Sequence, residues 1–312
     1  IKARSGTDAV VNHALYDSVR GTSKQLKANN TSADLAQGGI TSFDSNGFTL
    51  GSYIDANYNG NNCVAWCWKA GTAFSNDASA TSVGSIDSSG KINADAGIGI
   101  ITWTGTGSAG TIAHGLGAVP KFMMVKNRTD AGADWYCYHR ANGNTHSILL
   151  NSNGAKVGAY SDNWNNTTPT STVFSVGSSN STGGSSSDNM IAYVFADSKG
   201  FSKSGSYTGN GNADGTFVYT GFSPSFVMVK KTNGTGNWVM FDNKRNTFNV
   251  VDKRLVANLS DDEGTSDRLD FLSNGWKFRS TATNVNGSDS YIYMCFASQP
   301  FTTSTGIPCT AR

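Results

Sequence analysis

The run "WTGTGSAGTIAHGLGAVPKFMMVKNR" at residues 103–128 recurs as "YTGNGNADGTFVYTGFSPSFVMVKKT" at residues 207–232. Matching residues keep one constant spacing, so that Pro120 in the first run corresponds to Pro224 in the second. A self-match of this length at a fixed spacing is typical of repeated structural units. We therefore interpret the chain as containing a duplicated module.

A third copy opens the chain without its front part. "NHALYDSVRGT" at residues 12–22 parallels "NWVMFDNKRNT" at residues 237–247, and "SFDSNGFTLG" at residues 42–51 parallels "DFLSNGWKFR" at residues 270–279. The first residues, "IKAR", match only the end of the run that is repeated. We therefore expect that this copy lacks its opening strand and half of its second strand, and that Ile1 follows a larger protein in the native molecule.

Each copy ends with a similar apolar run. "NCVAWCWKAG" at residues 62–71 matches "NMIAYVFADS" at 189–198 and "SYIYMCFASQ" at 290–299. Alternate residues of a strand share one face, and here both faces are largely apolar. The pattern predicts that all three runs, the first included, are core strands buried on both sides.

The cysteines of the first closing run do not form a recognisable redox or metal site. On a strand, Cys63 and Cys67 would stand about 13 Å apart, at about 3.3 Å per residue. A disulfide needs Cα atoms within about 7 Å. Since Val194 takes the place of Cys67 in the second copy, we interpret both residues as buried, reduced core thiols. The chain has five cysteines, which is sparse for a disulfide framework and typical of folding in a cytosol.

The composition favours many short strands joined by turns. Of 312 residues, 36 are glycine, and Glu263 is the only glutamate. We predict an all-β fold of tandem antiparallel β-sandwich repeats, with about six strands each and very little helix. In the second copy, the expected strands lie near residues 98–104, 120–127, 134–139, 146–151, 172–176 and 190–196.

This organisation predicts four segments along the chain. Residues 1–71 form the first and incomplete repeat, and residues 72–97, which are rich in Gly and Ser, read as a linker or extended arm. Residues 98–200 form the second repeat, and residues 201–312 form the third repeat with a C-terminal tail.

Charge and hydropathy exclude two classes of partner. The net charge is +2, and the Lys and Arg residues are scattered rather than gathered in the basic stripe that nucleic-acid binding requires. No apolar run approaches the ~20 residues of a membrane-spanning helix. We therefore expect no nucleic-acid partner and no membrane insertion.

The sequence offers no cofactor site and no catalytic group. "GTGSAG" at residues 105–110 resembles a dinucleotide-binding loop, but no helix follows it to meet a pyrophosphate, so a glycine-rich turn is favoured. The histidines do not cluster, and His13 is replaced by Trp135 and Trp238 in the other copies. His139 and His146 could meet across a hairpin, but neither has an acidic neighbour at a recognisable spacing. The prediction is a protein without a cofactor that is not an enzyme.

Two loops carry candidate contact residues. The acidic loop with Asp261, Asp262 and Glu263 could hold calcium, but it lacks the alternating spacing of a calcium loop, and a solvated loop is favoured. In "SDNWNNTTPT", Trp164 lies beside Asn165 and Asn166. An exposed aromatic side chain among amides suits sugar stacking. A side chain that caps the end of the sandwich is the alternative, and we favour it slightly.

These runs resemble a known family. "NHALYDSVRGTSKQL", "ITSFDSNGFTLG", "CVAWCWKAG", "HGLGAVPKFMMVKNR" and "GSYTGNGNADGTFVYTGFSPSFVMVKK" are similar to a domain of unknown function that recurs in tailed-phage virion proteins, chiefly of marine and cyanobacterial phages. The resemblance covers nearly the whole chain and supplies no catalytic residues. It implies a virion structural protein, often a tail fibre, that folds in the host cytoplasm. Implied partners are other virion proteins, further copies of the chain in a homotrimer, and a host surface glycan or lipopolysaccharide bound for adhesion.

Three alternatives stay open at this point. The first is a non-adhesive virion component, such as a capsid decoration. The second is a glycan-degrading tailspike, which needs a pair of carboxylates. Asp17 and Asp242 take the same position in the first and third copies, but the second copy has His139 there, so we find no acidic position that all three copies share. The third is a carbohydrate-binding module of a secreted bacterial protein.

Overall fold

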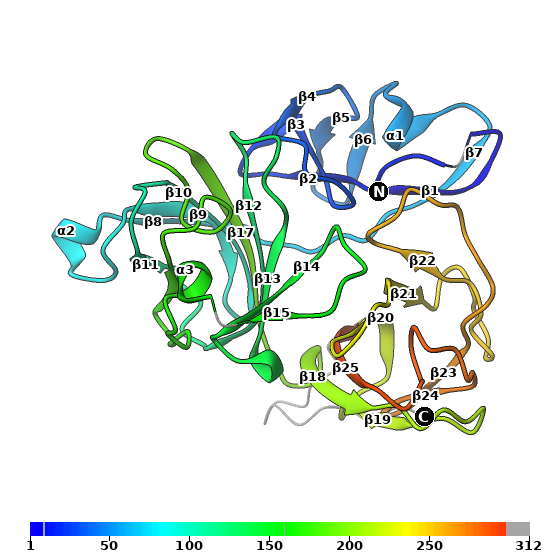
Figure 1. Ribbon diagram of the computed structural model, residues 1–312. Helices are drawn as coiled ribbons and strands as arrows, with labels where there is room; N and C mark the ends of the chain where they lie inside the picture. The colour runs from blue at the N-terminus through cyan, green and yellow to red at the C-terminus, as the bar shows by residue number, and fades with distance from the viewer. Residues whose placement is uncertain (9, 159, 298–312) are drawn as a thin grey trace.

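The computed structural model describes residues 1–8, 10–158 and 160–297, and in this part the fold is almost entirely β, as predicted (Figure 1). The predicted C-terminal tail and Cys309 lie outside the described residues. "First, second and third module" denote residues 1–71, 98–200 and 201–297 below. The described helices are single turns: α1 (Ile54–Asn57), α2 (Ala78–Thr81), α3 (Ser161–Trp164) and the 3-10 turn η1 (Arg140–Asn142).

The second module is built on an eight-stranded antiparallel sheet. In sheet order its strands are β15 (Val157–Gly158), β14 (His146–Leu149), β13 (Tyr136–His139), β12 (Pro120–Asn127), β17 (Asn189–Ala196), β10 (Ile98–Thr104), β9 (Ser88–Asn93) and β8 (Thr72–Asn76). The closing strand β17 therefore lies between β12 and the opening strand β10. All but the first of its residues are buried, as the alternating apolar pattern predicts.

The third module has the same order around its closing strand. Its five-stranded sheet runs β18 (Ser202–Thr208), β25 (Ser290–Ala297), β20 (Pro224–Lys231), β21 (Trp238–Asp242) and β22 (Leu255–Val256). The pairing register shifts between Pro120 and Phe122 in β12 and between Pro224 and Phe226 in β20. Proline has no N–H for the ladder and is tolerated at the first residue of a strand or at a bulge, which fits this shared irregularity.

Smaller sheets form a second layer. They are β11 (Gly110–Ala113) with β16 (Val173–Val176), β19 (Phe217–Tyr219) with β24 (Gly275–Phe278) and β23 (Leu269–Leu272), and β5 (Ile40–Phe43) with β6 (Phe48–Leu50). In the second module, Ile112 and Phe174 of the small sheet share one core with Met190 and Val194 of the large sheet. The glycine-rich run leads into β11 and not into a helix, and Gly107 has a left-handed φ of 73° that favours glycine.

The first module is less complete than the others. Its strands are β1 (Lys2–Gly6) paired with β7 (Asn61–Val64), and β2 (Ala14–Asp17), β3 (Gly21–Lys27) and β4 (Leu35–Ala36) in a second sheet. The prediction of a fully buried closing strand is wrong here, because β7 ends at Val64 and Cys63 and Cys67 are exposed. In the second module the counterparts Met190 and Val194 are covered by Ile112 and Phe174 of the second layer, and in the described residues β7 also has a strand partner on one side only.

Residues 72–97, expected to be a linker or an extended arm, form part of a sheet in the structure. They contribute β8 and β9, which pair with each other and extend the sheet of the second module beyond β10. Helix α2 lies between these two strands, and the Asp77 side chain caps its first turn. The Gly- and Ser-rich composition therefore belongs to a hairpin at a sheet edge, which projects to the left in Figure 1.

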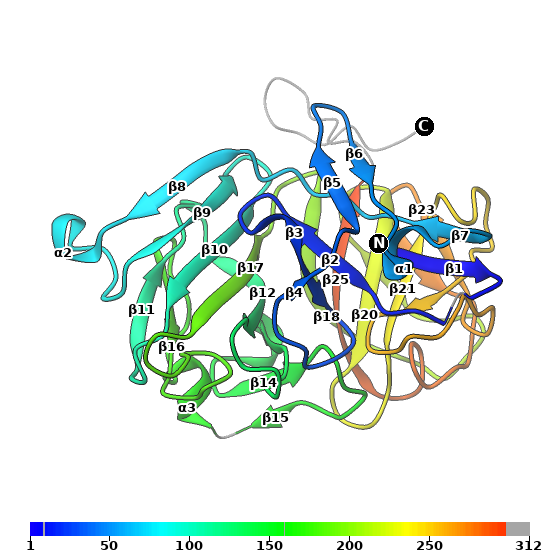
Figure 2. The same ribbon diagram turned by 90° about the horizontal axis from the view of Figure 1, so that it is seen from above.

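The three modules surround one shared core. Trp68, Phe195 and Phe296 occupy the same position of the closing run in the three modules. Their ring centroids form a triangle with sides of 6.5, 5.5 and 5.9 Å. A single cluster of buried side chains includes residues of all three modules around this triangle. Figures 1 and 2 show the modules arranged about this common centre.

The accessibility of the thiols gives a first testable prediction. In the folded protein, N-ethylmaleimide is expected to modify Cys63 and Cys67, while Cys137 and Cys295, which are fully buried, react only after unfolding. Peptide mapping by mass spectrometry, before and after addition of guanidinium, checks this. Protection of Cys63 and Cys67 to the same degree as Cys137 would contradict the exposed closing run.

Candidate functional site

The modules meet at three junctions that use the same position of the repeat. At each junction a ring nitrogen of one module bonds to a backbone carbonyl of the next. The three bonds join Trp135 Nε1 to Lys27 O at 2.9 Å, Trp238 Nε1 to Leu149 O at 2.8 Å, and His13 Nε2 to Val256 O at 2.9 Å. Second contacts first, third contacts second and first contacts third, so the junctions close a ring.

A second set of bonds joins the same three pairs of modules, with the donor and acceptor modules exchanged. Each is a backbone N–H that donates to a carbonyl of the neighbouring module. They join Asp34 N to Arg128 O at 3.0 Å, Lys156 N to Thr232 O at 3.0 Å, and Glu263 N to Arg4 O at 2.8 Å. The three junctions therefore share one backbone geometry, although their side chains differ.

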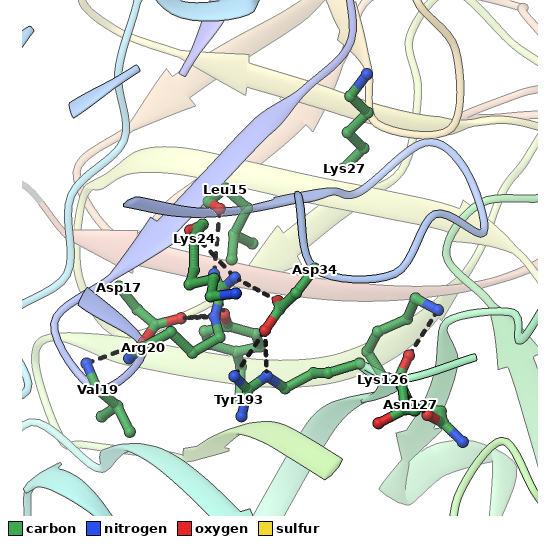
Figure 3. A network of polar contacts seen from close by, with 12 residues as sticks. Leu15, Asp17, Val19, Arg20, Lys24, Lys27, Asp34, Lys126, Asn127 and Tyr193 are labelled. Atoms are coloured by element: carbon green, nitrogen blue, oxygen red, sulfur yellow. Dashed lines mark hydrogen bonds and ion pairs between the residues drawn. The ribbon is translucent and has the colours of Figure 1, made fainter. Parts of the chain in front are cut away.

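The junction between the first and second modules holds a buried charge network (Figure 3). Arg20 Nε lies 2.5 Å from Asp17 Oδ2, and its Nη1 lies 3.0 Å from Asp34 Oδ1. Arg128 of the second module contacts the other oxygen of Asp34 at 2.6 Å. Tyr193, also of the second module, donates its hydroxyl to Asp17 at 2.6 Å. Since the Arg20 side chain is 0% exposed, its charge depends entirely on these partners.

A matched network lies between the third and first modules. Arg245 Nε contacts Asp242 Oδ2 at 2.6 Å, and its Nη1 contacts Glu263 Oε2 at 3.2 Å. Arg4 of the first module lies 3.8 Å from the same glutamate. Trp66, which occupies the position of Tyr193, donates its indole N–H to Asp242 at 3.1 Å. The two networks thus repeat each other residue by residue.

The junction between the second and third modules is built without these charges. His139 stands in the place of Asp17, and Asn142 in the place of Arg20. These two modules are consecutive in the chain, with only residues 197–201 between their strands. A short tether raises the effective concentration of the joined parts. The first and second modules are also joined by a short segment, residues 65–71 between β7 and β8, so chain connection alone does not decide which junctions carry a charged network.

The electrostatics of the two networks agree with their geometry. Burial alone would raise the pKa of Asp17, but the Arg20 guanidinium, the Tyr193 hydroxyl and nearby N–H groups together hold that pKa below its usual value. Burial would also raise the pKa of Asp242. The Arg245 guanidinium and the backbone N–H groups of Lys244 and Arg245 outweigh this effect, so the pKa of Asp242 is lowered as well. Both carboxyl groups are ionised acceptors at neutral pH.

His139 makes the junction between the second and third modules sensitive to acid. Its Nδ1 accepts from the Ala141 N–H at 3.1 Å, and its Nε2 lies 3.3 Å from the Tyr293 carbonyl, so both ring nitrogens are used by the neutral tautomer. Burial lowers the pKa of His139 to about 4. Unfolded chains bind this proton near pH ~6.5. Between these two values the unfolded state binds more protons, so the free energy of unfolding falls as the pH falls.

We therefore predict that His139→Gln flattens the acid side of the stability profile. The wild type is expected to lose about 1.4 kcal/mol per pH unit through this histidine between about pH 6 and pH 4, and the variant loses correspondingly less. Urea unfolding at a series of pH values measures the slope. His146→Gln, at a partly exposed ring, is the control. Equal slopes for wild type and His139→Gln would contradict the prediction.

Buried lysines add a further link between modules. Lys126 is 0% exposed, and its ammonium donates to the carbonyl of Thr31 in the first module and to carbonyls within its own module, at 2.7 to 3.2 Å. Lys230, at the same repeat position, donates to Asn153 and Gly154 of the second module. Burial lowers the pKa of each to about 8. These lysines hold loops of the neighbouring module in place.

The residues of the predicted acidic loop differ in their exposure to solvent. Asp261 and Asp262 are exposed, as expected of a solvated loop. Glu263 is not solvated, because its carboxylate belongs to the network of Arg245 and Arg4 and its side chain is only 9% exposed. Within the described residues, no group of three or more His, Cys, Asp or Glu side chains is arranged to hold a metal ion.

The sugar-stacking alternative for Trp164 is wrong. The side chain is 1% exposed, packs edge-on against Tyr138 at 5.8 Å and donates its N–H to the His146 carbonyl at 3.2 Å. Its apolar ring belongs to the core of the second module, so it cannot meet a ligand. Asn165 and Asn166 are exposed beside it and both have a left-handed φ of 48°. Their amides remain candidates for contact.

Exposed aromatic residues of β19 were missed from the sequence. Phe217 is 44% and Tyr219 is 58% exposed, while Val218 between them is buried. The Lys203 ammonium lies 5.3 Å from the Tyr219 ring centroid. Alternate residues of a strand share a face, so the two rings stand about 7 Å apart on one surface. The sequence did carry a signal for these rings, which is the alternation Phe-Val-Tyr. The second module lacks it, since Ala113 and Gly115 stand at the matching positions.

A shallow hollow of about 250 Å³ lies where the third module meets the first. It is lined by Val10, Arg254, Val256, Asp261, Asp262 and Gly264. The lining mixes two carboxylates with one guanidinium and has no histidine or thiol.

No described helix is long and apolar enough to cross a membrane.

Comparison with known proteins identifies one family. The model of a family described as a domain of unknown function, DUF7483, matches residues 1–300. No curated protein matches this chain. No solved structure matches it either.

Proposed function

The chain belongs to the DUF7483 family, and from that premise we propose that it is a non-catalytic structural protein of a tailed-phage virion, with an adhesive role such as that of a tail fibre. The single observation that carries the proposal is the ring of junctions. Four of its buried ionisable groups, Arg20, Asp17, Arg245 and Asp242, belong to networks that hold one module to another. This use of charge suits a rigid display scaffold.

We also infer that the three modules descend from one duplicated unit. Support comes from the strand order shared by the second and third modules, the shared bulge before Phe122 and Phe226, and the cyclic repetition of junction bonds. In this proposal a chain assembles with other virion proteins and with further copies of itself as a homotrimer. It folds in the host cytoplasm and acts on the particle.

The proposed contact surface combines the aromatic face of β19 with amide-bearing loops. Phe217 and Tyr219 offer two rings on one flat surface, a form suited to stacking on the apolar face of a sugar. Lys203 and Lys277 border the rings and could meet the phosphates of a lipopolysaccharide. Asn165 and Asn166 are a second, separate candidate on the second module.

Electron cryo-microscopy of the intact particle tests the proposal directly. Density for this fold at the tip of a tail fibre is the expected result, with β19 facing outward. An ordered lattice of the fold on the capsid would instead assign it to capsid decoration. Release of reducing sugars from host polysaccharide by the purified chain would overturn the non-catalytic proposal.

A double variant tests the contact surface. Phe217→Ala with Tyr219→Ala is expected to weaken binding to host lipopolysaccharide by about two- to tenfold per ring, since one aromatic contact is worth about 0.5–1.5 kcal/mol beyond its area. Both side chains are exposed, so the free energy of unfolding should change by less than about 0.5 kcal/mol for each. Binding is measured by surface plasmon resonance on immobilised lipopolysaccharide. Asn165→Ala with Asn166→Ala is the matched comparison, and equal binding by the wild type and the aromatic variant would contradict this surface.

A further inference from the structure

The outer edge of β7 differs from the same edge in the other two modules. The closing strand β17 pairs with β12 on one side and with β10 on the other. The closing strand β25 likewise pairs with both β20 and β18. Within the described residues, β7 pairs with β1 alone. The register is shared, because Val64 faces Lys2 as Ile191 faces Lys126.

Exposure along the closing run shows the consequence. Cys63, Ala65 and Cys67 are exposed. Their counterparts are all at most 4% exposed: Met190, Ala192 and Val194 in the second module, and Tyr291, Tyr293 and Cys295 in the third. Trp68 is 36% exposed, whereas the matching Phe195 and Phe296 are 6% and 4% exposed. An apolar strip that is core in two modules thus faces outward in the first.

The second layer repeats this difference. Strand β16 pairs with β11, and β24 pairs with β19 on one edge. In the part of the chain that is described, β6 pairs with β5 only. In the complete modules one continuous segment supplies both missing strands, since β10 runs on into β11 and β18 into β19. The two unpaired edges of the first module, on β7 and β6, are therefore the edges that the segments β10–β11 and β18–β19 cover in the other modules.

The complete modules also define the chemistry of the strand that fits. At the position of Cys63, the opening strand carries an aromatic residue, because Trp103 faces Met190 and Tyr207 faces Tyr291. The residue after the aromatic is Thr104 or Thr208, and it lies opposite the position of Asn62. An unpaired strand edge with small side chains is the template used when a peptide adds to a sheet.

We propose that the outer edge of β7 binds an extended strand of a partner polypeptide, antiparallel and in the register of β10 and β18. The bound strand places an aromatic residue opposite Cys63 and a threonine opposite Asn62. Its backbone pairs with residues 62–68, and the residues on the same face as the aromatic one lie opposite Ala65 and Cys67. The bound strand gives β7 the second pairing partner that β10 gives to β17 and β18 gives to β25.

Protection of the exposed thiols tests this proposal. The probe is a capped peptide with the sequence of residues 202–209, "SKSGSYTG". At about 90% occupancy, alkylation of Cys63 and Cys67 is expected to slow about tenfold, because the rate follows the population of the open form. Rates are read by mass spectrometry over a peptide titration. Cys137 and Cys295 serve as internal controls, since they stay protected with or without peptide.

A second peptide separates strand pairing from general adsorption. Proline in place of the central glycine removes one ladder N–H and fixes the backbone, so this peptide should not protect the thiols. Equal protection by both peptides, or no protection at the solubility limit of the first, overturns the proposal. Thiol protection that rises with protein concentration in the absence of peptide, with a dimer in light scattering, would assign the edge to a second copy and overturn it as well.

Discussion

Replacing Arg20 with alanine is expected to lower the free energy of unfolding by about 3–5 kcal/mol, the range seen when one partner of a buried ion pair is removed. The guanidinium touches both Asp17 and Asp34, and it also donates to the carbonyls of Leu15 and Lys24. Its loss leaves two carboxylates short of a counter-charge where little water reaches them. Urea unfolding followed by circular dichroism measures the change.

The control for Arg20→Ala is Arg140→Ala, at an exposed arginine that should change stability by less than about 0.5 kcal/mol. A double-mutant cycle with Asp17→Asn tests the pairing itself. The two changes together should cost less than the sum of the singles, with a coupling of about 0.5–3 kcal/mol, because the double variant leaves no lone charge at the pair. Strict additivity, or equal stability of the two arginine variants, would contradict the network.

The matched arginine of the third module extends this argument. Arg245→Ala removes the counter-charge of Asp242 and Glu263, so a loss of similar size is expected. No equivalent variant exists at the junction of the second and third modules, where Asn142 takes the arginine's place. That junction is held by apolar packing and by hydrogen bonds without an ion pair, among them those of Trp238 to Leu149 and of Lys230 to Gly154.

The sequence predicted the strands of the second module well, because their signal is local. Alternating apolar residues define β17, and the proline at the start marks β12. The failure at Cys63 and Cys67 has a different cause. Periodicity shows which faces are apolar, but it does not show whether a neighbouring strand is present to cover them. Burial of a strand is decided by long-range pairing.

The junctions could not be found from residue types alone. Asp17 and Arg20 are three residues apart, which is an unremarkable spacing, and Tyr193 reaches them only because the first and second modules pack together. The internal alignment did contain a signal, since the Asp and Arg of the first copy recur as Asp242 and Arg245. Charged residues that recur at one repeat position are the feature to seek in such chains.

Trp164 failed as a sugar contact for a related reason. Its neighbours Asn165 and Asn166 are polar, and a polar neighbourhood in sequence suggested a loop on the surface. In the structure α3 turns the indole inward while the amides stay outside. A large side chain at the end of a short helical turn can enter the core, and only the tertiary contacts decide this.

Replacing Phe195 with alanine is expected to destabilise the whole chain by about 3–5 kcal/mol and not the second module alone. Its ring lies 6.5 Å from Trp68 of the first module and 5.9 Å from Phe296 of the third, and it also packs against Phe122. The cavity therefore opens where the cores of three modules join. Phe122, Phe195 and Phe296 belong to one buried cluster that also holds Leu26 and Ala70 of the first module, so loss of packing there weakens every module.

The shared core also predicts how Phe195→Ala unfolds. Cys137 of the second module and Cys295 of the third are both fully buried, so pulsed alkylation reports the opening of each module separately. In the wild type and in the variant, both thiols should become reactive at the same urea concentration, which is lower in the variant. Phe217→Ala is the control, because its ring is 44% exposed and contributes little to the core. Exposure of Cys137 at a lower urea concentration than Cys295 would mean that the modules unfold independently. The triangle of aromatic rings would then be a contact between separate domains, and not the centre of a single cooperative unit.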